Sequence, residues 1–306
     1  MTLFRPISEG HGDCKVAEAP ARSRASLSRV NTTAASAPSD APLASTRIGE
    51  GSRRVAFLHG LMGRGRNFTG PAKELGDDFT VELIDLPDHG ASPWTDRVDY
   101  REIADRVAAH LRAGLAADGP VHLLGHSMGG KVAMVLALRH PELVDRLIVE
   151  DISPRLSPQA TDEFVHLLGT MLRMDLDAYD SRAEADAAMA EHVHDARVRG
   201  FLLQNLRRTA GHFAWQPNVA MLFEHLREIG SFPDPVVPED PERVFDHPVL
   251  WLAGAESDYV QDEDVPRMKE LFPRVVRVTV RDAGHWLHAD QPEAFVSAVR
   301  TFLTAD

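Results

Sequence analysis

Short apolar runs alternate with amphipathic stretches from about Arg53 to the end of the chain. The apolar runs, rich in Val, Ile and Leu, are RVAFLHG, FTVELIDLP, VHLLGHS, RLIVEDIS, VLWLAGAES and RVVRVTV. Runs that are apolar at successive positions are typical of strands buried on both faces of a parallel sheet. Helical periodicity fills the ranges Tyr100 to Leu115, Met128 to His140, Val265 to Leu271 and Pro292 to Leu303. Strand alternating with helix predicts a doubly wound α/β sheet.

The alternation stops between Pro154 and His247. The segments TDEFVHLLGTMLRMDL, RVRGFLLQNLRR and NVAMLFEHLREI have helical periodicity, and we expect no strand in this interval. Because sheet-forming segments lie on both sides of it, we interpret residues 154–247 as a helical cap. The cap is inserted into a core made of residues 46–153 and 248–306.

The first 45 residues have a different composition from the rest. They are rich in Ala, Ser, Pro and Arg, and NTTAASAPSDAPLAS offers too little apolar surface to offset the entropy cost of ordering it. We predict a disordered tail, or a start codon assigned too early. An organellar presequence is the alternative, and Glu9, Asp13 and Glu18 disfavour it because such presequences contain few acids.

Charge and cysteine content limit the partners. The net charge of −13 provides no basic field for nucleic acid, since the basic cluster in the tail is sparse. A single cysteine, Cys14, excludes an internal disulfide framework and a thiolate metal cage. No apolar run reaches the roughly 18 residues that a membrane span needs, and we see no secretory signal. We therefore expect a cytoplasmic protein; its oligomeric state is not indicated.

The strand-to-helix turn at Gly125-His126-Ser127-Met128-Gly129 carries the clearest chemical signal. G-x-S-x-G in this setting is the nucleophile-elbow pattern, in which glycines two residues either side make room for a serine in a strained conformation. The serine hydroxyl then lies above the carboxyl edge of the sheet. The N–H of Met128 is predicted to stabilise an oxyanion.

A serine nucleophile needs a base and a second oxyanion donor. His285 follows the last predicted strand and reaches the same edge of the sheet, so we take it as the base. His288 is interpreted as a structural or rim histidine. The loop FLHGLMGRGRNF places the N–H of Leu61 opposite that of Met128. In DLPDHGAS, His89 and Ser92 are expected to brace the neighbouring loops.

Two carboxylates could complete a triad. Asp151 ends the strand beside the nucleophile strand, and Asp258 follows the next strand along. Either loop could bring a carboxylate to the far nitrogen of His285. The residues by themselves leave the choice open.

The motifs HGLMG, LPDHGASP, GHSMGGKVAM, VEDISP and AGHWLHADQPEAF resemble the α/β-hydrolase superfamily, and within it a group of small bacterial and mitochondrial acyl-esterases. The resemblance runs from about Arg53 to the C-terminus. It implies an α/β-hydrolase fold with an inserted helical cap. Most members carry the acid three residues after a glycine of the penultimate strand. In this sequence that position is occupied by Ser257. The acyl-esterase group instead uses the aspartate of DISP, so the resemblance favours Asp151 over Asp258 and makes Ser257 an auxiliary partner.

The implied activity is hydrolysis of small-to-medium carboxylic esters or acyl thioesters through an acyl-enzyme, without a metal or organic cofactor. A cofactor-free haloperoxidase or perhydrolase, or a hydrolase of carbon–carbon bonds, would keep the same triad. A non-catalytic ligand-binding module is a further alternative. We expect the substrate to be a small molecule bound by apolar cap residues. These residues are Phe164, Leu168, Trp215 and Met221.

Overall fold

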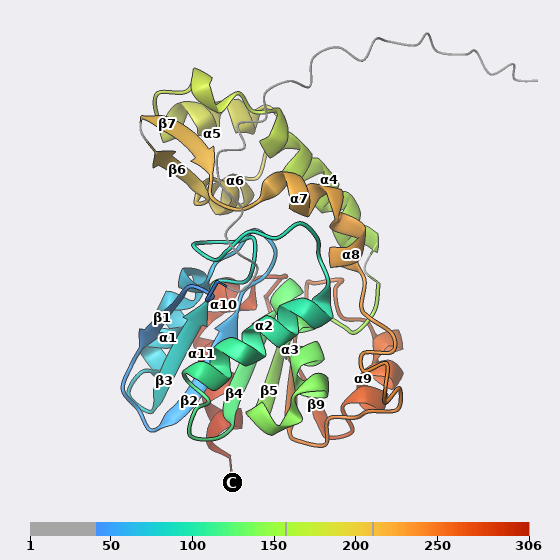
Figure 1. The fold of residues 1–306 in the computed structure, drawn as a ribbon. Helices are drawn as coiled ribbons and strands as arrows, with labels where there is room; N and C mark the ends of the chain where they lie inside the picture. Colours follow the sequence, from blue (N-terminus) through green and yellow to red (C-terminus); the bar gives the residue numbers. More distant parts are fainter. Residues whose placement is uncertain (1–40, 157, 210, 306) are drawn as a thin grey trace, which may run out of the picture. The chain divides into compact units, whose positions relative to one another are not determined.

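A seven-stranded sheet in the order β1-β3-β2-β4-β5-β8-β9 forms the centre of the core (Figure 1). The structure, a computed structural model, describes residues 41–156, 158–209 and 211–305. The strands are β1 (Ser45–Ile48), β2 (Arg53–Leu58), β3 (Phe79–Ile84), β4 (Val121–His126), β5 (Val144–Glu150), β8 (Val249–Gly254) and β9 (Val275–Val280). Only β1 is antiparallel to its neighbour, and the other pairs are parallel. The predicted doubly wound α/β sheet is confirmed.

Helices cover both faces of this sheet. Helices α2 (Tyr100–Ala113), α3 (Met128–Arg139) and α9 (Val265–Leu271) pack with one apolar cluster, and α1 (Thr69–Leu75) and α11 (Pro292–Thr304) pack with the other. Successive residues of β2 and β4 alternate between the two clusters, since side chains alternate across a strand. The remaining core elements are α10 (Leu287–Asp290) and the short 3₁₀ turns Gly65–Phe68, Pro141–Leu143 and Asp262–Asp264.

Strand β1 was missed by the sequence analysis, because STRI is a short and mostly exposed edge strand. It also moves the start of the folded chain into the predicted tail. Leu43 is buried, the Ala44 N–H donates to Ser92 Oγ at 2.9 Å, and Ser45 pairs with Ile84. The other residues of the predicted tail, 1–40, lie outside the described residues. Ser92 therefore holds this N-terminal segment through its hydrogen bond with the Ala44 N–H.

In the interval expected to be helical, the described residues form five helices and a hairpin. The helices are α4 (Pro158–Arg173), α5 (Arg182–Ala190), α6 (Ala196–Leu203), α7 (Val219–Glu224) and α8 (Leu226–Gly230), with a 3₁₀ turn at Leu176–Ala178. Strands β6 (Leu206–Thr209) and β7 (His212–Trp215) pair antiparallel, so the prediction of no strand was wrong. Gly211 at the turn has φ +92°, a conformation that favours glycine. Leu206, which pairs with Trp215, and Phe213, which pairs with Arg208, are buried, and the Arg208 guanidinium lies over the Phe213 ring.

Within the described residues, no helix is both long and apolar enough to cross a membrane. The parallel strands all end at the same edge of the sheet. The turns after β4, β5, β8 and β9 therefore bring residues that are far apart in sequence to one place, which is where open α/β sheets bind ligands.

Candidate active site

Ser127 lies on a strained turn between β4 and α3. Its backbone angles are φ 52° and ψ −120°, which a residue with a side chain rarely adopts. A Cβ added at Gly125 would come within 2.2 Å of the Gly129 carbonyl oxygen, and one at Gly129 within 2.5 Å of the Leu58 carbonyl oxygen. The turn therefore needs glycine at both positions, as the pattern predicted. The Ser127 N–H donates to the Glu150 carbonyl at 3.0 Å, which ties the turn to strand β5.

His285 is held by Asp151. The Nδ1–H of His285 donates to Asp151 Oδ2 at 2.8 Å, and the Asp151 side chain is fully buried. Asp151 also accepts a hydrogen bond from the Gly254 N–H at 2.9 Å and one from the Ser257 hydroxyl. These three donors stabilise a buried carboxylate that would otherwise be costly. Ser257 is therefore placed where the resemblance implied, beside the carboxylate.

Asp258, the alternative acid, is exposed. Among the hydrogen bonds and ion pairs of the described residues, none joins its carboxylate to His285, and its carbonyl accepts from Gln261. The structure thus brings Asp151 to the imidazole and leaves Asp258 outside.

Tyr259 stacks on His285, a contact that the sequence analysis missed. The two rings lie 3.8 Å apart at an angle of 16°, and the Tyr259 N–H donates to Ser257 Oγ at 3.3 Å. Burial raises the pKa of Tyr259, so the phenol stays neutral. Stacking and the Asp151 bond together fix the plane of the imidazole. No local pattern marks a tyrosine for this role.

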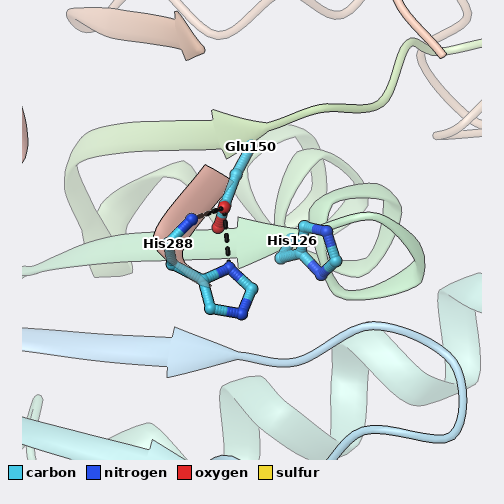
Figure 2. A group of neighbouring side chains, drawn as sticks. All are labelled: His126, Glu150 and His288. Carbon is cyan, nitrogen blue, oxygen red and sulfur yellow. Dashed lines mark hydrogen bonds and ion pairs between the residues drawn. The ribbon is translucent and has the colours of Figure 1, made fainter. Parts of the chain in front are cut away.

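A second set of polar side chains, His126, Glu150 and His288, comes from the ends of β4 and β5 and from α10 (Figure 2). Glu150 is fully buried and accepts hydrogen bonds from the His288 backbone N–H at 3.1 Å and from its Nδ1–H at 2.8 Å. His126 Nε2–H donates to the carbonyl oxygen of His285 at 2.8 Å. Consecutive residues of the β5 end, Glu150 and Asp151, thus hold two histidines of one loop. His288 has the structural role that we expected for it.

These three side chains are also the group of described residues whose donor atoms could hold a metal, since they lie within 4.8 Å of one another. In the structure one nitrogen of each histidine is already engaged, His288 Nδ1 with Glu150 and His126 Nε2 with the His285 carbonyl. Burial, together with the neighbouring His285 and His288, lowers the pKa of His126 well below its usual value. A neutral His126 carries one N–H, which this hydrogen bond uses to fix the His285 backbone.

The loop after β2 offers Leu61 as a backbone donor. The Met62 N–H donates to His89 Nε2 at 3.1 Å and the Gly63 N–H to the Gly60 carbonyl at 2.9 Å. Among the hydrogen bonds of the described residues, none uses the Leu61 N–H. Leu61 and Ser127 border the same cavity. The loop therefore presents one donor without an acceptor beside the serine.

Two buried histidines fix this loop. His59 Nδ1–H donates to the Gly60 carbonyl at 2.8 Å, and its Nε2 accepts from the Leu86 N–H at 2.9 Å. His89 Nδ1–H donates to the Pro87 carbonyl at 2.9 Å, and its Nε2 accepts from Met62. Each ring therefore has to be neutral, with the proton on Nδ1. His89 braces the loop as expected, and the equivalent role of His59 was missed.

This arrangement makes stability depend on pH. Burial and the neighbouring His89 lower the pKa of His59 from 6.5 to about 3. Between these values the unfolded chain binds a proton that the folded chain does not, so stability is complete above about pH 6.5 and is lost as the pH falls. We expect His59 to reduce the free energy of unfolding by up to about 1.4 kcal/mol per pH unit below this point. Urea denaturation at pH 7, 6 and 5 measures this slope.

The His59→Gln variant tests the contribution of His59, because titrating groups that do not interact with His59 cancel in the difference between the two proteins. The variant is expected to be less stable at pH 7 and to lose less stability on acidification. Equal pH slopes would contradict the assignment of a neutral buried His59.

The cap contributes to the same loop. Asn205 is fully buried, and its Nδ2 donates to the Met62 carbonyl at 2.7 Å. The Asn67 Nδ2 donates to Gln204 Oε1 at 2.8 Å. Both contacts join residues more than a hundred positions apart. The helical pattern of FLLQNLRR therefore did not predict them. The loop that carries Leu61 is thus anchored from the core and from the cap.

A cavity of about 730 Å³ opens over these residues and is bordered by Ser127 and His285. Of the cap residues predicted to bind substrate, Phe164 lines it. The other three do not border this cavity: Leu168 and Met221 are buried, and Trp215 donates its Nε1–H to the Met171 carbonyl. Apolar periodicity identifies a buried helix face, but it does not distinguish the cap interior from a cavity wall. Other cap residues on the wall are Glu163, Leu167, Arg197, Val198 and Phe201.

Comparisons with known proteins agree with this geometry. Residues 55–298 match the model of the alpha/beta hydrolase family. The sn-1-specific diacylglycerol lipase ABHD11 of Danio rerio is 36% identical over 257 residues, which are 82% of this chain and 78% of that protein. Esterase YbfF of Escherichia coli is 28% identical over 252 residues, which are 81% of this chain and 92% of that protein. A solved structure, a marine microorganism esterase, superposes with a TM-score of 0.80 at 33% identity over 85% of this chain and 99% of that one. The chain belongs to the α/β-hydrolase family.

Proposed function

We propose that this protein is a serine hydrolase that cleaves carboxylic esters through an acyl-enzyme. The observation that carries the proposal is a serine on a strained elbow that borders the same cavity as a histidine held by a buried aspartate. Relatives named as esterases and lipases support the ester as the substrate class. The cap, residues 154–247, would close the substrate off from water.

Each residue has a defined part in this reaction. Ser127 attacks the ester carbonyl while His285 Nε2 takes its proton, and Asp151 keeps the imidazole in the tautomer with the proton on Nδ1. The backbone N–H groups of Leu61 and Met128 stabilise the negative charge that develops on the carbonyl oxygen. His285 then gives its proton to the departing alcohol. A water activated by His285 releases the acid.

The residues around the triad would preserve this geometry. The Ser257 hydroxyl and the Gly254 N–H donate hydrogen bonds to the Asp151 carboxylate and would hold it in position against His285. Tyr259 limits rotation of the imidazole through its stacking contact. The steps of this mechanism use side chains and backbone N–H groups of this chain, and none of them requires a bound metal ion.

A fluorophosphonate probe tests the proposal, because it reacts covalently with an activated serine. We expect stoichiometric labelling of the purified protein at Ser127, mapped by mass spectrometry of the labelled peptide. Loss of aryl-ester hydrolysis should follow the labelling in proportion. Labelling should fall to background after heat denaturation. A folded protein that neither reacts with the probe nor hydrolyses an aryl ester would support the ligand-binding alternative instead.

A further inference from the structure

A second, much smaller cavity also opens at the nucleophile. It measures about 30 Å³, against about 730 Å³ for the large one. Both cavities are bordered by Leu61, Ser127, Phe164 and Tyr259, so they approach each other at the point where a scissile carbonyl would bind. The other residues of the small cavity are Met128, Lys131, Ile152, Leu226, Ile229 and Gly230.

The chemistry of the proposed function assigns a different part of the substrate to each cavity. The departing alcohol takes its proton from His285, and His285 borders the large cavity but not the small one. The carbonyl oxygen has to face the N–H groups of Leu61 and Met128. The acyl chain then takes the remaining direction, toward the small cavity that Met128 borders.

Given the proposed function, we infer that the preferred substrates are esters of very short acyl groups, acetyl or propionyl, with a large uncharged alcohol. A cavity volume of about 10–15 Å³ is enough to hold one water-sized group. The small cavity therefore admits about two groups the size of a methyl beyond the carbonyl carbon. Longer chains would have to displace well-packed side chains, which is costly in a protein interior.

The wall of the small cavity is fixed against the core. Lys131 Nζ donates to the carbonyls of Arg155 at 3.1 Å, Gly230 at 2.6 Å and Ser231 at 2.8 Å, which together can accept all three hydrogens of its protonated form. Burial lowers the pKa of Lys131 to about 7. The Tyr100 hydroxyl donates to the Ile229 carbonyl at 2.6 Å. These bonds attach the end of helix α8 to helices α3 and α2. A shift of α8 that widened the cavity would have to break or lengthen these hydrogen bonds.

The large cavity favours an uncharged alcohol. Its wall includes the carboxylates of Glu163, Glu256 and Asp282, and its cationic side chain, Arg197, is paired with Asp290. A leaving group with several phosphates, such as coenzyme A, would meet uncompensated negative charge there. The aromatic rings of Phe201 and Trp286, 5.2 Å apart, offer an apolar surface instead.

A series of p-nitrophenyl esters tests the acyl side, because the leaving group stays constant while the acyl chain grows. We expect kcat/KM to be highest for acetate and propionate and to fall by about tenfold or more by octanoate, the scale of one or two misfitted methylenes. A maximum at octanoate would overturn the inference and leave the proposed function intact. No hydrolysis of any ester, together with no fluorophosphonate labelling, would contradict the proposed function itself.

Two cavity variants locate the effect. Leu226→Ala and Ile229→Ala each enlarge the small cavity from helix α8, and both are expected to move the optimum toward butyrate or longer chains. Leu222→Ala is the matched control, since Leu222 is buried in the adjacent helix α7 and borders neither cavity. The chain-length order of the control should equal that of the parent. An unchanged order in both α8 variants, or an equal change in the control, would overturn the assignment.

The alcohol side is tested by leaving groups that differ in charge. Acetyl-coenzyme A is expected to be cleaved at least about tenfold less efficiently than an acetyl thioester of a neutral thiol, which corresponds to about 1.4 kcal/mol of repulsion. Equal efficiency for the two thioesters would show that the acidic wall does not select against anionic leaving groups.

Discussion

Asp151→Asn is expected to lower kcat for ester hydrolysis by about 10³–10⁴-fold, the scale seen when a triad acid becomes an amide. The carboxylate accepts the Nδ1–H of His285 and so leaves Nε2 free to take the serine proton. An asparagine can offer an N–H at this position, which favours the opposite tautomer and removes the base. Steady-state kinetics on p-nitrophenyl acetate measure the loss. Circular dichroism should show an intact fold.

Asp258→Asn is the matched control, because it makes the same chemical change on the neighbouring loop at an exposed side chain. We expect kcat within about twofold of the parent, as is usual for a surface substitution that breaks no contact. Ser257→Ala should give an intermediate loss, since it removes one of the donors to Asp151. Activity of Asp151→Asn equal to the parent, or a larger loss in Asp258→Asn, would overturn the assignment of the acid.

Ser127→Gly is expected to abolish ester hydrolysis, by about 10⁶-fold in kcat, while raising the stability of the fold. Glycine lacks the nucleophile, and it adopts φ 52° and ψ −120° without the strain of a side chain. We expect the free energy of unfolding to exceed that of Ser127→Ala by about 1 kcal/mol, at the lower end of the cost of such strain. Denaturant titration of the two variants measures this difference.

Ser127→Ala is the control for this comparison, since it removes the hydroxyl but retains the Cβ and therefore the strain. Its activity should be as low as that of Ser127→Gly. If Ser127→Gly were clearly less stable than Ser127→Ala, the turn would not store strain. If either variant retained parental activity, Ser127 would not be the nucleophile.

The alternation of buried strands and helices was predicted from sequence because a strand covered on both faces has to be apolar at successive positions. The strands β2, β3, β4, β5 and β8 follow this rule over most of their length, whereas the edge strand β9 is rich in valine but largely exposed. The missed elements do not follow it. Strand β1 lies at an edge and is mostly exposed, and hairpin β6–β7 depends on a glycine turn and on pairing between two short segments. Local periodicity carries little information about such elements.

The elbow serine and the histidine were also predictable, because backbone strain requires glycines at fixed offsets and because the chain order places His285 at the same sheet edge. The contacts of His285 were not. Asp151 and Asp258 both follow strands that end beside the elbow, and the residues alone left the choice between them open. The stacking of Tyr259, the bond from Asn205 to Met62, and the size of the acyl cavity all join segments far apart in the chain.

What the amino-acid sequence determined by itself is therefore the layered α/β architecture, the position of Ser127 and the candidates for its partners. These depend on local rules: which faces of a strand are apolar, and where only glycine avoids a steric clash. The tertiary structure decided which carboxylate reaches His285, which histidines must stay neutral, and how much room lies on each side of the nucleophile. Those properties depend on distances between side chains from different strands and from the cap, and such distances exist only once the chain is packed.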